Sequence, residues 1–300
     1  MVRTERDGVL LQVWLDAPAS RNALSDAMVQ SLVQALQQAA QWPDCRALVL
    51  RGAGGTFCAG GDFGRFRSLM AEPAPALGPD PIATFNRAFG AMLQAWRASA
   101  VPTLAVVEGA AMGGGCGLAA ACDVVLAADS AVLAMPELTL GLPPAQIAPF
   151  VAERIGQRQA LRLMATGQRV PADEALRLGL VDQVVPASAL DEALQAWAQP
   201  LRRAEPQALR ATRAILQRAA QASLDDTLDF AAQCFAQALR SGTASEGLSA
   251  LGSDRSGIED RRTTSGRNGP ATLPRAGRSR LSGPRRSLRD GGLGDGSDGC

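Results

Sequence analysis

The chain has 300 residues, of which 47% are hydrophobic and 20% are charged, and its formal net charge is +1. This composition is typical of a globular protein, and the length allows two domains or one large α/β domain. His, Lys and Tyr are all absent, so all 30 basic residues are arginine. These absences exclude histidine triads, lysine Schiff bases and P-loop lysines, and they leave Asp, Glu, Cys, Ser, Thr, Arg and backbone amides for chemistry.

Charge and hydropathy also limit the classes of partner that the protein can bind. A net charge near zero argues against a nucleic-acid partner, and no apolar run reaches the roughly 18 residues of a membrane span. Residues 1–7 are charged and lack the apolar core of a signal peptide. The six cysteines show no CxxC spacing, which favours reduced thiols. We therefore expect a cytoplasmic protein that binds neither nucleic acid nor membranes.

The first half of the chain alternates apolar strands, glycine-rich turns and helices, which predicts an α/β fold. Residues 71–81 are rich in proline and are expected to lack regular structure. The expected strands are Val9–Leu15, Arg46–Leu50, Thr103–Val107 and Asp123–Ala127. The expected helices follow an N-cap at Ser25, span Ile82–Ala98, and follow the glycines Gly113–Gly117.

From Ala145 onward the pattern is almost purely helical. The expected helices are Gln146–Ile155, Gln157–Thr166, Ala172–Leu178, Leu190–Ala204, Pro206–Gln221 and Leu224–Leu239. The helices after Leu190 have apolar faces that need a partner, from the same chain or from another subunit. Residues 252–300 carry 10 arginines and six acidic residues with few large apolar ones. They are expected to form a disordered tail, with an RNA-binding tail or an out-of-frame read of the gene as alternatives.

Two glycine loops each follow a buried strand: Ala59–Asp62 and Gly113–Gly115. Small residues at such turns can direct free backbone amides into a cavity, and two converging amides form an oxyanion hole. Glycines that serve only tight turns would give the same spacing, so spacing alone does not decide between these interpretations.

Sequence motifs decide in favour of the oxyanion hole. The segments Phe57–Asp62 (FCAGGD), Val107–Gly117 (VEGAAMGGGCG) and Met135–Pro143 (MPELTLGLP) resemble motifs of the crotonase (enoyl-CoA hydratase/isomerase) superfamily. The resemblance covers residues 8–251 and implies a spiral of repeated ββα units with a C-terminal helical trimerisation region. The implied domains are a core with the CoA-thioester site at 1–189, a helical oligomerisation region at 190–251 and the tail at 252–300. A homotrimer or a dimer of trimers is implied.

The resemblance also assigns residues to the site. Gly61 and Gly114 match the two amide donors to the thioester oxygen, and Glu137 matches a catalytic glutamate. No metal is implied, and no cofactor apart from the coenzyme A of the substrate. Binding of the acyl-CoA substrate is assigned to Arg21, Ala23, Ala59, Gly61, Asp62, Gly114 and Gly117.

Well-known hydratases of this superfamily carry a second glutamate at the position of Gly117. Hydratases of β-branched glutaconyl-CoA substrates can likewise carry glycine there. The stretch Leu142–Val151 (LPPAQIAPFV) resembles that branch, above all the hydratases of isohexenylglutaconyl-CoA, and we expect hydration of such a 2-enoyl-CoA. The missing side chain is expected to enlarge the pocket for a branched acyl group. Two alternatives remain: a Δ3,Δ2-enoyl-CoA isomerase with Glu137 as its single base, and a non-catalytic acyl-CoA scaffold.

Other candidate residues have simpler interpretations. Asp62 is expected to be a helix N-cap and Asp123 to be structural. Cys116 lacks a basic partner, so its thiol is expected to be inert. Glu108, at the end of a strand, is not expected to be catalytic. Three arginines near the proline-rich loop are candidates for CoA phosphates or a substrate carboxylate: Arg65, Arg67 and Arg87.

Overall fold

The structure is a computed structural model that describes residues 1–73, 75, 77–242, 244 and 248. The chain divides into two compact units, Met1–Gly247 and Leu248–Cys300, and only Leu248 of the second unit is described. The tail expected at residues 252–300 therefore lies outside the described residues.

A six-stranded sheet forms the centre of the first unit, with strand order β1-β2-β3-β4-β6-β9. Its strands are β1 (Val2–Asp7), β2 (Leu10–Leu15), β3 (Ala47–Gly52), β4 (Thr103–Val107), β6 (Val124–Ala128) and β9 (Gln183–Val185). All neighbours pair in parallel except β1 and β2, which are antiparallel. Parallel strands are covered on both faces, which explains why β2, β3, β4 and β6 are nearly continuous apolar runs.

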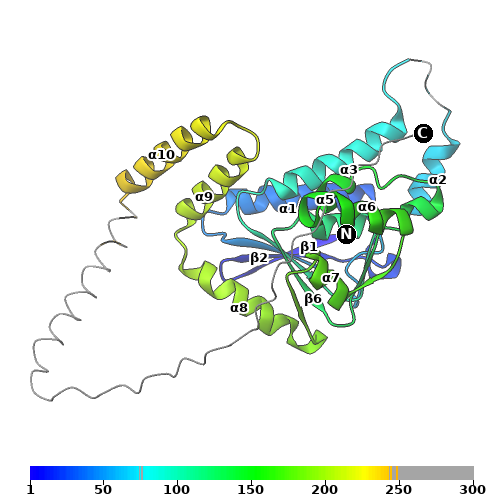
Figure 1. Ribbon diagram of the computed structural model, residues 1–300, viewed down its shortest axis with the longest axis horizontal. Helices are drawn as coiled ribbons and strands as arrows, with labels where there is room; N and C mark the ends of the chain where they lie inside the picture. The colour runs from blue at the N-terminus through cyan, green and yellow to red at the C-terminus, as the bar shows by residue number, and fades with distance from the viewer. Residues whose placement is uncertain (74, 76, 243, 245–247, 249–300) are drawn as a thin grey trace, which may run out of the picture. The chain divides into compact units, whose positions relative to one another are not determined.

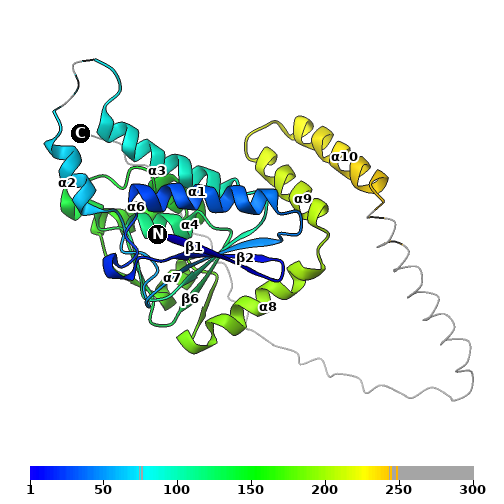
Figure 2. The same ribbon diagram turned by 180° about the vertical axis from the view of Figure 1, so that it is seen from behind.

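Helices cover both sides of this sheet. In both views α1 (Asp26–Gln41) and α3 (Pro81–Arg97) lie side by side above the sheet, and α8 (Leu190–Arg203) lies below it (Figures 1 and 2). The predicted cap of α1 is confirmed, since the Ser25 side chain accepts a hydrogen bond from the Met28 amide at 3.3 Å. The residues that α1 buries follow helical spacing: Met28, Leu32, Ala35 and Ala39.

A second, three-stranded sheet contains β5 (Ala110–Met112), β7 (Val132–Ala134) and β8 (Val170–Pro171), in the order β5-β7-β8. Strand β4 continues through β5 into the helix α4 (Gly114–Ala120), and β6 continues through β7 into the 3-10 helix η2 (Glu137–Leu140). Each turn of the chain thus passes from the large sheet to the small one and then to a helix. This is the ββα spiral that the motifs imply, and the α/β prediction is confirmed.

Most of the remaining helices agree with the sequence pattern, but the pattern does not predict the helices Pro18–Ser20, Phe63–Ala71 and Ala187–Ala189. The expected bounds Gln157–Thr166 and Ala172–Leu178 are confirmed, and the helix Ala148–Ile155 begins two residues later than expected because the chain turns first at Pro143 and Pro144. These helices are η1 (Pro18–Ser20), α2 (Phe63–Ala71), α5 (Ala148–Ile155), α6 (Gln157–Thr166), α7 (Ala172–Leu178), η3 (Ala187–Ala189), α9 (Pro206–Ala219) and α10 (Leu224–Arg240).

Several elements escape the sequence pattern. Strand β1 is a charged edge strand with four of its six residues exposed, so it lacks the apolar run of a buried strand. Strands β5, β7, β8 and β9 have only two or three residues each, too few for a detectable period. Strands β8 and β9 are the only strands after Ala145 among the described residues, so the expectation of an almost purely helical pattern there is confirmed apart from these two short strands.

The helices after Leu190 differ in how they pack. Leu190, Leu194 and Ala198 of α8 are buried, so this helix belongs to the body. No residue of α9 is buried, and α10 buries only Thr227. The apolar face of α8 therefore has its partner in the same chain, which is one of the two alternatives expected. Helices α9 and α10 contact each other, and large apolar side chains of α10 stay exposed. No helix among the described residues is both long and apolar enough to cross a membrane.

Candidate active site

The first glycine loop is joined to the start of the second by backbone hydrogen bonds. The Cys58 amide donates to the Ala110 carbonyl at 2.9 Å, and the Met112 amide donates to the Cys58 carbonyl at 2.9 Å. These bonds continue the small sheet sideways and bring Ala59–Asp62 next to Gly113–Gly115. A β-carbon built on Gly60 would lie 3.9 Å from the amide nitrogen of Gly114. Two loops about 50 residues apart in sequence thus form one site.

The loop at residues 21–24 belongs to the same cluster. The Ala59 amide donates to the Arg21 carbonyl at 2.9 Å, and the Leu24 amide donates to the Gly60 carbonyl at 2.8 Å. The structure therefore brings together Arg21, Ala23 and Ala59, the residues assigned to CoA binding.

Asn22 organises this loop, and the sequence interpretation missed its role. Its side chain is fully buried, accepts from the Ala17 amide, and donates to the carbonyls of Ala53 and Thr56 at 2.9 and 2.7 Å. Its φ is +59°, in the left-handed region that asparagine tolerates better than most residues. The signal available in the sequence was an asparagine in the loop before a helix, because asparagine adopts a positive φ more readily than most residues.

Replacing Asn22 with alanine is expected to lower the free energy of unfolding by about 3 kcal/mol, because three buried backbone groups lose their partners. Urea unfolding monitored by circular dichroism measures the change. Ser31→Ala is the matched control, since the Ser31 hydroxyl makes only an exposed bond to the Ala27 carbonyl. Equal shifts of the unfolding midpoint in both variants would contradict a structural role for Asn22.

Two backbone amides in the cluster are available to a ligand. Gly114 is the first residue of α4, so its amide has no acceptor within the helix. Among the described residues, no acceptor is found for the amide of Gly61 either. Aromatic rings flank both positions: β-carbons built on Gly61 and Gly114 would lie 2.5 Å from Cζ of Phe66 and 3.2 Å from Cζ of Phe89. The arrangement offers two hydrogen-bond donors in apolar surroundings.

Glu137, the first residue of η2, lies against the second glycine loop. A β-carbon built on Gly113 would lie 2.8 Å from Oε1 of Glu137, so the carboxylate adjoins the peptide that precedes the Gly114 amide. Oε2 is buried and has no hydrogen-bond partner among the described residues. Burial raises the pKa of the Glu137 carboxyl above its ordinary value, because the charged form loses solvation. A partly desolvated carboxylate with one oxygen left free suits general-base chemistry.

Gly117 lies one helical turn after Gly113, and the space beside it is filled. A β-carbon built on Gly117 would lie 2.5 Å from Cβ of Ile147 and nearer still to its Cγ2. Ile147 is only 3% exposed. The expectation that Gly117 enlarges the pocket is therefore wrong, because the chain before α5 approaches α4 and Ile147 takes the room that a side chain would need.

The nearby acids and the thiol have structural explanations. Asp62 caps α2, since Oδ1 accepts from the Gly64 amide at 2.8 Å, which confirms the N-cap prediction. Asp123 accepts from the Thr103 amide and from Arg213 at 2.7 and 2.5 Å, so it is structural as expected. Burial, and to a lesser extent the charge of Glu137, raises the pKa of the Cys116 thiol to about 12, which keeps it protonated.

The arginines near the proline-rich loop differ in their contacts. Arg65 forms ion pairs with Asp26 and Glu72 at 3.2 and 3.8 Å. Arg87 donates to Gln94 at 3.3 Å, and Arg67 is exposed. None of these contacts places an arginine beside Glu137.

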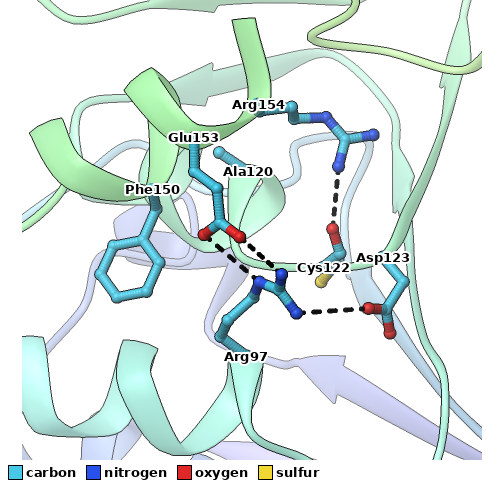
Figure 3. A pocket seen from close by; sticks show the side chains of 7 residues that line it. All are labelled: Arg97, Ala120, Cys122, Asp123, Phe150, Glu153 and Arg154. Carbon is cyan, nitrogen blue, oxygen red and sulfur yellow. Dashed lines mark hydrogen bonds and ion pairs between the residues drawn. The ribbon is translucent and has the colours of Figure 1, made fainter. Parts of the chain in front are cut away.

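A cavity of about 220 Å³ lies elsewhere, at the amino end of β6 (Figure 3). Its charges are satisfied within the protein: Arg97 bonds to Glu153 and pairs with Asp123, and Arg154 donates to the Cys122 carbonyl. The glycine loops instead follow the carboxyl ends of β3 and β4, where ligands of α/β sheets usually bind. We therefore assign the site to the glycine loops. Among the described residues, no group of three or more Cys, Asp or Glu is placed to hold a metal ion.

Solved structures with the same fold include several that are named as enoyl-CoA hydratases or hydratase/isomerases. An enoyl-CoA hydratase/isomerase from Marinobacter aquaeolei matches with a TM-score of 0.80 and 40% identity, over 84% of this chain and 96% of that one. Pseudomonas aeruginosa AtuE matches with a TM-score of 0.78 and 43% identity, over 83% and 95%. The fold thus places the protein in this class.

Sequence comparison leads to the same family. Residues 5–255 match the family model for enoyl-CoA hydratase/isomerase. A probable enoyl-CoA hydratase, echA8, from Mycobacterium tuberculosis is 34% identical over 83% of this chain and 94% of its own. The 2,3-dehydroadipyl-CoA hydratase of Escherichia coli is 33% identical over 81% and 91%. The chain belongs to the enoyl-CoA hydratase/isomerase family.

Proposed function

We propose that the protein hydrates the double bond of a 2-enoyl-CoA, and that its natural substrate is a β-branched glutaconyl-CoA of the isohexenylglutaconyl-CoA type. The observation that carries the catalytic part is the position of the Glu137 carboxylate beside Gly113, with a buried Oε2 that has no hydrogen-bond partner among the described residues. The hydratase names of the relatives support hydration. The branched acyl group rests on the resemblance of residues 142–151 to that branch of hydratases.

In this mechanism the thioester oxygen accepts hydrogen bonds from the amides of Gly61 and Gly114. Polarisation of the conjugated system makes the β-carbon electrophilic, and each donor contributes about 2.7–4 kcal/mol as negative charge develops. Glu137 takes a proton from the attacking water and returns it to the α-carbon of the enolate. Addition on one face lets one carboxylate serve in both steps. Arg21, Ala23, Ala59 and Asp62 would line the CoA side of the site.

The isomerase alternative has a specific observation in its favour. Gly117 brings no second carboxylate, and aliphatic Ile147 covers it. A water held for attack needs two or more polar partners, whereas a proton moved between two carbons needs only one base. A 3-enoyl-CoA is the substrate that such a site would convert to the conjugated 2-enoyl isomer.

A panel of linear and β-branched enoyl-CoAs separates these functions. Loss of the ultraviolet absorbance of the conjugated thioester indicates hydration, and a gain with a 3-enoyl-CoA indicates isomerisation. A branched glutaconyl-CoA should give a larger kcat/KM than crotonyl-CoA. Absence of any change with every substrate, together with measurable acyl-CoA binding, would leave the scaffold alternative.

We further propose that the chain assembles through α9 and α10 as a trimer or a dimer of trimers. Leu224, Leu228, Phe235 and Leu239 form one stripe along α10 and are 48–72% exposed. Light scattering should give three or six times the chain mass of 31.1 kDa. Leu228→Glu with Phe235→Glu should lower that mass. The control Leu161→Glu, which changes a leucine on α6 that is 68% exposed, should not. A monomeric wild-type protein at micromolar concentration would contradict the assembly.

A further inference from the structure

Two residues that are distant in sequence have complementary sizes at the site. Gly117 on α4 has no side chain, and Ile147, just before α5, puts its β-carbon and Cγ2 into the space that a side chain at 117 would occupy. Ile147 is almost fully buried, so its side chain is fixed between the two helices. Ile147 can therefore approach α4 this closely only because residue 117 is glycine.

The same face of α4 carries Glu137. Gly113 and Gly117 are one turn apart, and the Gly117 amide donates to the Gly113 carbonyl at 3.0 Å. Residues four apart lie on one face of a helix. The Glu137 carboxylate therefore covers Gly113, and the Ile147 side chain covers the next turn. The base and the aliphatic side chain are neighbours along α4.

The segment before Ile147 is held firmly. The Gln146 amide group donates to Asn86 on α3 at 2.7 Å, and the Ala148 amide donates to the Pro144 carbonyl at 3.0 Å. The Leu142 amide donates to the Glu137 carbonyl at 3.1 Å, which ties the segment to the catalytic turn itself. Because hydrogen bonds hold the segment on both sides of Ile147, the Ile147 side chain can act as a rigid wall.

We propose that Ile147 is a specificity-determining residue of the Glu137 site, and that its side chain forms the apolar wall against which a group on the β-carbon of the acyl chain packs. This proposal rests on the proposed function, because it assumes that the acyl group lies between Glu137 and α4. The wall stands where a second carboxylate on α4 would face Glu137. The same contact therefore makes the site a one-base site and shapes its acyl pocket.

Ile147→Ala tests the wall by removing three carbon atoms without adding a polar group. The ratio of kcat/KM for 3-methylcrotonyl-CoA to that for crotonyl-CoA should fall by about 10-fold or more, because the branch loses its apolar contact and one methylene in an apolar pocket discriminates by that amount. Ile147→Val keeps the branch at Cβ and should give a smaller fall. This milder variant also provides the test if Ile147→Ala folds poorly.

Val151→Ala is the matched control. Val151 lies one turn further along α5, is fully buried, and donates its amide to the Ile147 carbonyl at 3.1 Å. It should lower stability to a similar extent and leave the ratio unchanged. An unchanged ratio in both Ile147 variants, or an equal fall in Val151→Ala, would overturn the proposal.

A binding measurement separates this proposal from the proposed function. Calorimetry with the saturated thioesters 3-methylbutanoyl-CoA and butanoyl-CoA gives the ratio of their Kd values without any turnover. If the wild type converts no enoyl-CoA, the proposed function fails, and a shift of that ratio in Ile147→Ala still supports the wall. If neither thioester binds, both proposals fail.

Discussion

Replacing Glu137 with glutamine is expected to lower kcat by at least about 100-fold while acyl-CoA affinity stays nearly unchanged, because the change removes the base and preserves its shape. The chain has no His, Lys or Tyr that could take over the proton. Steady-state kinetics on the best substrate of the panel gives kcat, and calorimetry with a saturated acyl-CoA gives the affinity. The affinity serves as the control, since the amides of Gly61 and Gly114 remain in place.

The pH dependence has a definite sign. Burial raises the pKa of Glu137, so the carboxyl takes up its proton at a higher pH than an ordinary glutamate does. A base works only when deprotonated, and kcat/KM should therefore fall as the pH is lowered through this raised pKa. The residual activity of Glu137→Gln should lack that acidic limb. Near-full activity of Glu137→Gln would mean that the base is Asp62, Glu108 or a carboxylate of the substrate.

Stability should move in the opposite direction to activity. Because the pKa of this acid is higher in the folded state, ionisation of Glu137 opposes folding as the pH rises above the ordinary glutamate value. Glutamine carries no charge to desolvate, so Tm at neutral pH should stay the same or rise. A clear fall in Tm would show that the loss of rate includes a loss of structure.

The sequence predicts those parts of the fold in which burial leaves a long, uniform pattern. Strands β2, β3, β4 and β6 are apolar runs of five or six residues because both faces are covered, and helices α6 and α7 end at glycines in the left-handed conformation. Strand β1 could not be predicted in this way, since an edge strand exposes its polar side chains. The two-residue strand β8 exists only because β7 offers it a partner.

The residues of the candidate site also fall into two groups: those with a local sequence signature and those whose position depends on a distant contact. Glycines that free an amide leave a local signature, and so does the aspartate that caps α2, so Gly61, Gly114 and Asp62 could be found from sequence motifs. Ile147 could not, because its role depends on a contact across 30 residues with a position that has no side chain. A glycine leaves an open space only if no other residue fills the volume of the missing side chain. The sequence alone does not show which residue fills it.

Gly117→Glu tests that contact from the other side and is expected to abolish activity rather than redirect it. On sequence grounds the new carboxylate would restore a two-acid site and favour linear enoyl-CoAs. In the structure its β-carbon would lie 2.5 Å from Cβ of Ile147, so the chain before α5 would have to move away from α4. Forcing extra atoms into a packed core costs about 1–3 kcal/mol, and burying an unpaired carboxylate adds to that.

The displaced segment also carries the hydrogen bond from the Leu142 amide to the Glu137 carbonyl, so the turn that holds Glu137 should shift with it. Urea unfolding and kinetics on the enoyl-CoA panel should both register the change. Combining Gly117→Glu with Ile147→Gly leaves only the Cα of residue 147, at 3.4 Å from the new β-carbon, and should recover part of the stability. If Gly117→Glu alone is as stable as the wild type and prefers linear substrates, the segment before α5 moves at little cost and Ile147 does not form a rigid wall.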